Sequence, residues 1–309
     1  MSLRLRGLIA ATFTPMHEDG SLNLGRIGPY VEHLLCDGVS GLYVCGSTGE
    51  GVSLTSEERE AAAAAFVAAA NGRCPVVVQV GHNSLRDARR LAAHAQRIGA
   101  TAISAVPPSY FLPHGLDGLV DCLAEIASGA PELPFYYYHI PSKTGVAVDT
   151  VELLRVGSRR IPSLAGMKFT SPLAYEYQAC LAVDDGRFDI LWGTDEMLLS
   201  VWVLGCRGAV GSTYNYAAPL YRSMIDAWER GDSQAASACQ AKSVELVRAF
   251  SRFPGGVPPQ KAIVGLIGCE CGPTRLPLPT FTNGNELADE LRRIGYFQWG
   301  RGERQPSCL

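Results

Sequence analysis

The stretch "SLAGMKFTSPLAYEYQACLAV", residues 163–183, combines a short apolar strand with a helical pattern. The apolar residues that precede Lys168 are typical of a strand that is buried on both of its faces. Lys168 places a cation near the end of this strand, directly before Phe169. The residues that follow, 173–183, are predicted to form a helix. The number of such strand-helix units along the chain then indicates the fold class.

Short apolar strands alternate with longer helical patterns over the first 232 residues. The predicted strands are 8–15, 41–46, 75–81, 102–108, 134–141, 164–170, 188–194 and 208–215. The helices predicted to follow them are 27–38, 56–72, 84–100, 115–128, 149–158, 173–183, 196–206 and 219–232. Eight such units in about 250 residues are typical of a (β/α)8 barrel. The alternative, a doubly wound sheet, usually carries a GxGxxG motif after its first strand, and the sequence has none there.

The remaining residues extend this barrel and give no sign of a linker. Residues 233–309 contain three helical patterns, "SQAASACQAKSVELVRAFSRF", "PPQKAIVGLIG" and "NELADELRRIG". We therefore predict an α/β fold, a TIM barrel with additional C-terminal helices. Residues 1–309 are expected to form a single domain, in which 1–232 are the barrel and 233–309 a helical appendage.

The composition excludes several classes of partner. The 309 residues carry 27 Lys and Arg against 30 Asp and Glu, and no basic stripe occurs, so neither a nucleic-acid nor a membrane partner is expected. No apolar run is long enough to span a bilayer. The ten cysteines show neither framework spacing nor a CxxC pair, and no HExxH motif occurs, which indicates reduced thiols and no metal site. These features predict a cytoplasmic protein.

Polar residues collect where the predicted strands end, which is where barrel enzymes build their active sites. They comprise "GSTGE" (46–50), Tyr138, Lys168, Thr170, "GTDE" (193–196) and "GSTYN" (211–215). Each has an ordinary explanation: Ser, Thr and Gly cap helices and form turns, a strand-end lysine can reach solvent, and His139 can be a packing residue. Lys168 and Tyr138 on neighbouring strands, beside a loop of hydroxyl groups, are harder to explain by packing alone.

The chemistry that fits this set is amine catalysis. An amine held away from water is driven towards its neutral, nucleophilic form. Such an amine attacks a ketone and forms a Schiff base, whose iminium accepts electrons while an adjacent carbon–carbon bond breaks. A tyrosine hydroxyl could move the protons, and a Gly-Ser-Thr turn suits a carboxylate. The residues predict a lysine-dependent aldolase that acts on a 2-keto acid.

These residues match a known family. With "GSTGE", "YHIP", "GMK" and the glycine-rich turn of the eighth strand, the chain resembles the superfamily of N-acetylneuraminate lyases and dihydrodipicolinate synthases over essentially its full length. Within this superfamily it is most similar to the animal-type sialic acid aldolases. That choice rests on "YYYHIP", "GTDE", "GAVGSTYNY" and the tail "QKAIVGLI…GPTRLPL".

The resemblance implies a catalytic role for three residues. Lys168 would form the Schiff base with the keto group of open-chain sialic acid, and Tyr138 would shuttle the proton in retro-aldol cleavage. Tyr110, in "PPSYFLP", would complete the hydroxyl relay from a neighbouring subunit. The products would be pyruvate and N-acetylmannosamine.

The resemblance also implies a substrate site for a 2-keto acid sugar. Ser47 and Thr48 would hold the carboxylate, and Thr170 would lie beside the imine. The polyol chain would be bound by Gly193, Asp195, Glu196 and Ser212, since carboxylates accept strongly from sugar hydroxyls. Members of the family are typically homotetramers and use no metal or organic cofactor.

One residue departs from the lyase pattern. Lys143, in "IPSKTG", stands where lyases usually have an apolar residue and synthases an arginine that grips a second carboxylate. An exposed loop lysine is the simpler interpretation. Two alternatives to the lyase therefore stay open: another pyruvate-dependent aldolase, such as a dihydrodipicolinate synthase or a 2-keto-3-deoxy sugar acid aldolase, and a barrel that binds without catalysis.

Overall fold

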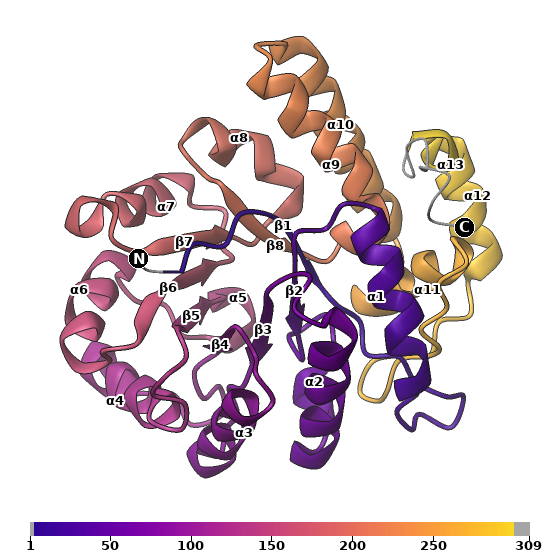
Figure 1. The fold of residues 1–309 in the computed structure, drawn as a ribbon. Coiled ribbons are helices and arrows are strands. Elements are labelled where there is room, and N and C mark those ends of the chain that lie inside the picture. The colour runs from indigo at the N-terminus through magenta and orange to yellow at the C-terminus, as the bar shows by residue number, and fades with distance from the viewer. Residues whose placement is uncertain (1–2, 300–309) are drawn as a thin grey trace.

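The computed structural model describes residues 3–299, and its centre is a closed barrel of eight parallel strands (Figure 1). The strands pair in chain order, and β8 pairs back with β1. They are β1 (Gly7–Ala11), β2 (Gly41–Val44), β3 (Val76–Gln79), β4 (Ala102–Ala105), β5 (Phe135–His139), β6 (Leu164–Phe169), β7 (Asp189–Trp192) and β8 (Gly208–Gly211). The predicted (β/α)8 barrel is confirmed.

Helices surround the barrel, as each strand is followed by at least one of them (Figure 1). The α-helices are α1 (Ile27–Cys36), α2 (Ser56–Ala70), α3 (Leu85–Arg97), α4 (Gly115–Ala127), α5 (Pro141–Thr144), α6 (Thr150–Arg160), α7 (Ala174–Leu181), α8 (Leu198–Val203) and α9 (Tyr214–Glu229). Short 3₁₀ turns are η1 (Leu24–Arg26), η2 (Gly51–Ser53), η3 (Val183–Gly186) and η4 (Asp195–Met197).

Most predicted helices differ from the structure by up to three residues at an end, and two differ in more than their ends. The helix predicted from residue 219 starts at Tyr214, but Ala217 leaves helical geometry (φ −137°, ψ 18°) just before Pro219. Proline has no N–H to donate and clashes with the preceding turn, so the chain forms one short turn, bends, and begins a new helix. The helix predicted over 196–206 is likewise divided into η4 and the shorter α8.

Local sequence explains the start of α2. Thr55 Oγ1 accepts from the Glu58 N–H at 3.2 Å, and Glu58 Oε2 accepts from the Thr55 N–H at 2.9 Å. This reciprocal capping box satisfies two N–H groups that lack helical partners. The helix ends at Asn71, which adopts a left-handed conformation with φ 47°.

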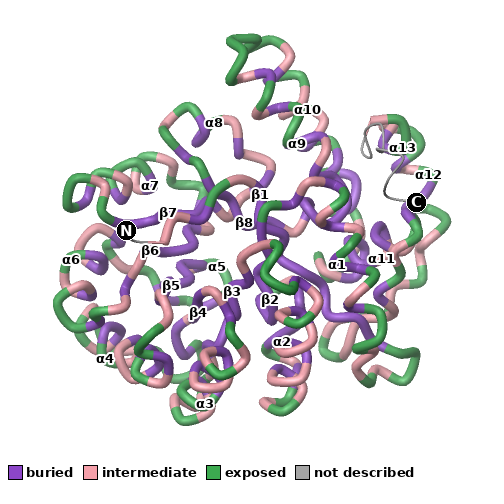
Figure 2. The backbone as a smooth tube through the Cα atoms, viewed as in Figure 1, coloured by how far each residue is buried: buried purple, intermediate pink, exposed green. Residues whose placement is uncertain are grey.

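The strands are buried, as the purple tube at the centre of Figure 2 shows. Their side chains alternate between two cores. Helix-facing residues form the larger core, to which Tyr137 belongs. Barrel-facing residues form a smaller cluster: Leu5, Ile9, Ala11, Tyr43, Val77, Ala102, Tyr136, Tyr138, Ile140, Leu191 and Val210. A period of two along β5 therefore points Tyr136 and Tyr138 into the barrel and Tyr137 towards the helices.

The C-terminal helices pack on one side of the barrel. They are α10 (Ser233–Phe250), α11 (Val257–Leu266), α12 (Gly284–Arg293) and α13 (Tyr296–Trp299). Figure 1 shows α10 alongside α9 and the later helices beside α1. Their separation from the barrel at residue 232 remains a prediction. Within residues 3–299, no helix is both long and apolar enough to cross a membrane.

Candidate active site

Lys168 points into the barrel from the end of β6. It lies between Tyr138 of β5 and Leu191 of β7 in the strand register, and both neighbours belong to the barrel-facing cluster. Only 5% of Lys168 is exposed. Its Nζ lies 4.2 Å from the centre of the Tyr138 ring and 4.4 Å from that of Tyr43. The two residues expected to act together, Lys168 and Tyr138, are therefore in contact at the carboxyl ends of adjacent strands.

Tyr43 of β2 is a member of this cluster that the sequence analysis missed. Its ring meets that of Tyr138 edge to face, with centres 5.7 Å apart, and its hydroxyl donates to Ser104 Oγ at 3.0 Å. Burial, together with Tyr138, raises the pKa of Tyr43 well above its ordinary value, so Tyr43 stays neutral. The face of its ring lies against Lys168 Nζ, a position from which it would stabilise the positive charge of an iminium on that nitrogen. The one signal in the sequence was a tyrosine inside the apolar run 41–46.

His139 lies on the opposite face of β5 and takes no part in this cluster. Its ring is 5.2 Å from Phe169 and 5.9 Å from Tyr137, measured between centres. Burial lowers the pKa of His139 to about 4, so the imidazole is neutral at pH 7. It packs between the barrel and its helices, as the ordinary interpretation of this residue predicts.

Thr170 and Gly193 form a second contact at the same end of the barrel. A Cβ atom on Gly193 would collide with Thr170 Oγ1, so only glycine allows the threonine to occupy this place. Thr170 Oγ1 is buried, and no group within residues 3–299 hydrogen-bonds to it. A hydroxyl in this state is available to a bound ligand.

Asp195 is held at the neighbouring strand end by β8 and the turn after it. Its Oδ2 accepts from the Thr213 N–H at 2.9 Å and from Thr213 Oγ1 at 2.6 Å, and that hydroxyl also contacts Tyr221 OH at 2.8 Å. A Cβ atom on Gly211 would collide with the Asp195 carboxylate, which explains the glycine. Burial raises the pKa of Asp195 to about 6, while Thr213 and, to a smaller extent, Lys168 oppose the shift.

The raised pKa predicts how Asp195 affects stability. Between pH about 4 and 6 the folded chain retains a proton that the unfolded chain has lost, so the free energy of unfolding falls as pH rises through this window. We expect Asp195→Asn to remove this slope in denaturant unfolding at pH 4.5 and 6.5. The exposed Asp226→Asn should keep it, and an unchanged slope in Asp195→Asn would contradict the assignment.

The loop after β2 carries the hydroxyl groups expected to bind a carboxylate. Ser47 is exposed and Thr48 is half-buried, at the same end of the barrel as Lys168. The loop closes on itself, as the Glu50 N–H donates to Ser47 O at 3.2 Å and the Gly51 N–H to Gly46 O at 3.0 Å. Glu50 is buried and ion-paired with Lys261 of α11, a pairing that the sequence analysis did not anticipate.

Three predicted site residues, and Lys143 as well, lie at the rim of the barrel. Glu196 and Ser212 are half-buried beside Asp195 and Thr213 in the chain. Tyr110 is 79% exposed in the loop after β4, where its N–H donates to Asn83 Oδ1 at 3.2 Å. Lys143 is exposed at the end of the barrel, in the short helix α5.

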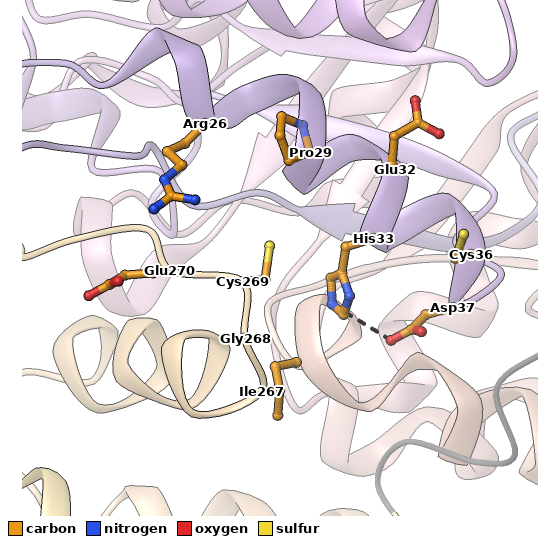
Figure 3. Close-up of a pocket in the computed structure, with 10 residues that line it drawn as sticks. All are labelled: Arg26, Pro29, Glu32, His33, Cys36, Asp37, Ile267, Gly268, Cys269 and Glu270. Atoms are coloured by element: carbon orange, nitrogen blue, oxygen red, sulfur yellow. Dashed lines mark ion pairs between the residues drawn. The ribbon is translucent and has the colours of Figure 1, made fainter. Parts of the chain in front are cut away.

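A separate cleft of about 300 Å³ lies outside the barrel, between α1 and the segment after α11 (Figure 3). It contains none of the predicted residues; its lining is Arg26, Pro29, Glu32, His33, Cys36, Asp37, Ile267, Gly268, Cys269 and Glu270. Over residues 3–299, no group of three or more His, Cys, Asp or Glu side chains is arranged to hold a metal ion.

Comparisons with known proteins find relatives of this chain both by sequence and by fold. The sequence profile of the dihydrodipicolinate synthetase family matches residues 4–293. The N-acetylneuraminate lyase of Xenopus tropicalis is 44% identical over 89% of this chain and 91% of its own, and that of Rattus norvegicus is 41% identical over 90% and 88%. The solved N-acetylneuraminate lyase of Proteus mirabilis superposes with a TM-score of 0.92 at 38% identity, covering 96% of this chain and all of that one.

Proposed function

Because this chain belongs to the dihydrodipicolinate synthetase family, we propose that it is a class I aldolase that cleaves N-acetylneuraminate to pyruvate and N-acetylmannosamine. The relatives at 41–44% identity are N-acetylneuraminate lyases, which are carbon–carbon lyases. The observation that carries the proposal is the buried Lys168 amine, set against the rings of Tyr138 and Tyr43 inside the barrel.

Lys168 provides the electron sink. Its neutral amine adds to the keto carbon, and loss of water gives an iminium. When the hydroxyl beside the scissile bond loses its proton, the carbon–carbon bond breaks, the sugar leaves as an aldehyde, and the electron pair forms an enamine. Protonation of the enamine carbon and hydrolysis then release pyruvate and regenerate the amine. The iminium supplies the electron sink, so this scheme uses no metal or organic cofactor.

We propose that Tyr138 moves the proton. Its ring centre lies 4.2 Å from Lys168 Nζ, so a substrate bound to that nitrogen would lie beside this tyrosine. In this proposal Tyr138 first gives its proton to the hydroxyl that leaves as water when the iminium forms. The resulting phenolate takes the proton of the reacting hydroxyl, returns it to the enamine carbon, and regains a proton from the water that hydrolyses the iminium. Tyr43 cannot easily take this role, because its hydroxyl is engaged by Ser104.

The remaining rim residues are proposed to bind the substrate. Ser47 and Thr48 hold the carboxylate, and the unpartnered Thr170 hydroxyl lies beside the imine. Asp195, Glu196 and Ser212 accept or donate hydrogen bonds along the polyol chain, and Gly193 leaves space for Thr170. Anionic acceptors suit a chain of sugar hydroxyls.

Tyr110 is proposed to act in an assembly of identical subunits, a homotetramer. Tyr110, Phe111 and Leu112 form an exposed apolar loop at the rim, with 79%, 84% and 54% of each residue exposed. Contiguous apolar exposure of this kind favours a protein interface. We expect the chain to sediment as an oligomer and Phe111→Glu to weaken it and lower turnover. The equally exposed Leu276→Glu is the control, and a fully active monomer would contradict the proposal.

We also propose a cytoplasmic location. The buried Cys45, Cys180 and Cys206 are unbridged thiols, as expected where the medium is reducing. Imaging of a fluorescent fusion would test this, and signal confined to a secretory compartment would contradict it.

Borohydride trapping with pyruvate tests the proposed function. The chain has four lysines, Lys143, Lys168, Lys242 and Lys261, so peptide mass mapping distinguishes all of them. We expect a pyruvyl adduct on Lys168. An adduct there and cleavage of N-acetylneuraminate would establish the lyase. An adduct without cleavage would favour another pyruvate-dependent aldolase, and folded protein without an adduct would favour a non-catalytic barrel.

A further inference from the structure

The loop that carries Ser47 and Thr48 is anchored by a buried ion pair to the far end of the chain. Lys261 Nζ of α11 lies 2.9 Å from Glu50 Oε1, although the two residues are 211 positions apart. Their side chains are 1% and 0% exposed. Lys261 also donates to Pro273 O at 2.6 Å, and the Arg275 N–H donates to Glu50 Oε2 at 2.8 Å. Both oxygens of Glu50 are therefore bound by the C-terminal appendage.

The loop needs such an anchor because its backbone is unfavourable. Cys45 and Glu50, which flank the sequence GSTG, have φ of 58° and 56°. Neither is a glycine, and the left-handed region is costly for other residues. Such conformations persist only where surrounding contacts hold them in place. The ion pair of Glu50 is one such contact, and Thr14 Oγ1, which donates to Gly49 O at 2.7 Å, is another.

A second layer fixes the appendage to the start of α2. The Arg275 guanidinium donates to Glu58 at 2.6 and 2.7 Å, and Glu58 is the capping-box residue that closes the loop's other side. Nε and Nη2 of Arg275 also donate to Gly20 O at 2.9 and 2.6 Å. The side chain of Arg275 thus binds the start of α2, and the backbone N–H of Arg275 binds Glu50. The loop between β2 and α2 is therefore supported at both ends.

From these contacts we infer that the C-terminal appendage positions the carboxylate-binding loop, with Lys261 acting on Ser47 and Thr48 through Glu50. Lys261 is a positioning residue here, since it does not reach the barrel interior in this arrangement. The inference rests on the proposed function, because it assigns the loop to a 2-keto acid carboxylate. It predicts that loss of the anchor weakens recognition of the carboxylate more than it affects reaction at Lys168.

The test compares pyruvate with hydroxyacetone, a neutral ketone of similar size that lacks the carboxylate. Borohydride trapping on Lys168 of the full chain gives the half-saturating concentration of each. We expect Lys261→Met to raise the value for pyruvate by at least about tenfold and that for hydroxyacetone by less than about twofold. It should raise KM for N-acetylneuraminate more than it lowers kcat. Arg252→Met, which removes an appendage ion pair with Glu290, is the control and should change neither.

The outcomes separate the two proposals. Equal effects on both ketones, or none on pyruvate, would overturn the positioning role while leaving the lyase intact. Wild-type protein that traps no pyruvate would overturn both. If Lys261→Met does not fold, Glu50→Gln combined with Lys261→Met avoids a lone buried charge, and Thr14→Val removes the other loop contact. Either variant, when folded, should show the same selective loss for pyruvate, and wild-type values in both would overturn the inference.

Discussion

Lys168→Ala is expected to lower kcat for N-acetylneuraminate cleavage by at least about 10⁴-fold, because the lost amine is the nucleophile. The two rings that contact its amine belong to Tyr43 and Tyr138, which offer no second amine to replace it. The fold should persist, since Lys168 packs against these two rings and forms no ion pair within residues 3–299. Circular dichroism and initial rates measure the two quantities.

The variant Lys168→Met distinguishes the role of the amine from the role of the side chain's packing. Methionine keeps a flexible apolar stem of similar length, so it should fold as well as the wild type and be equally inactive. Lys242→Ala, which lies away from the barrel interior on α10, is the control and should retain full turnover. Residual activity near wild type in Lys168→Ala would exclude the Schiff-base assignment.

Tyr138→Phe is expected to lower kcat by about 10² to 10⁴-fold, the range over which general acid–base groups contribute. The change removes only the hydroxyl, and the ring should keep its contacts with Lys168 and Tyr43. Since the hydroxyl acts in the transition state, KM should change much less than kcat. Trapping of pyruvate on Lys168 should persist, because the nucleophile is intact.

The neighbouring Tyr137→Phe is a matched control. Tyr137 lies on the same strand but faces the helices, and its buried hydroxyl has no hydrogen-bond partner within residues 3–299. Its removal should leave kcat unchanged. If Tyr138→Phe also retained wild-type kcat, Tyr138 would be a packing residue, and another group would have to transfer the proton.

Lys168 could be assigned to the site from the sequence because the apolar residues around it are a local property. Tyr138 was assigned from its place at the end of a strand and from the resemblance carried by "YHIP". A lysine inside an apolar run is unusual at any position, and strand ends of a barrel meet at one edge whatever the details of packing. The same argument predicted that the turns 46–50, 193–196 and 211–215 share this edge, which the closed strand order confirms.

The sequence could not show which side chains enter the barrel. In strands that are buried on both faces, polar and apolar residues do not alternate, so the sequence does not show which side chains point into the barrel. Tyr136, Tyr137 and Tyr138 therefore look equivalent along the chain. In the closed barrel, the side chains of Tyr136 and Tyr138 point into the interior. Tyr43 was missed for the same reason, since only the register of distant strands brings it to Lys168.

The barrel, the family and the order of polar groups along one rim could be predicted from the sequence, since hydrophobic periodicity and short motifs are encoded locally. The pairing of Glu50 with Lys261 and of Asp195 with Thr213 is visible only in the folded chain. In each pair, the number of residues between the two groups does not indicate how close they lie in the folded chain. The strength of each pair depends on its burial and on the short distance between donor and oxygen. Both conditions exist only in the folded chain.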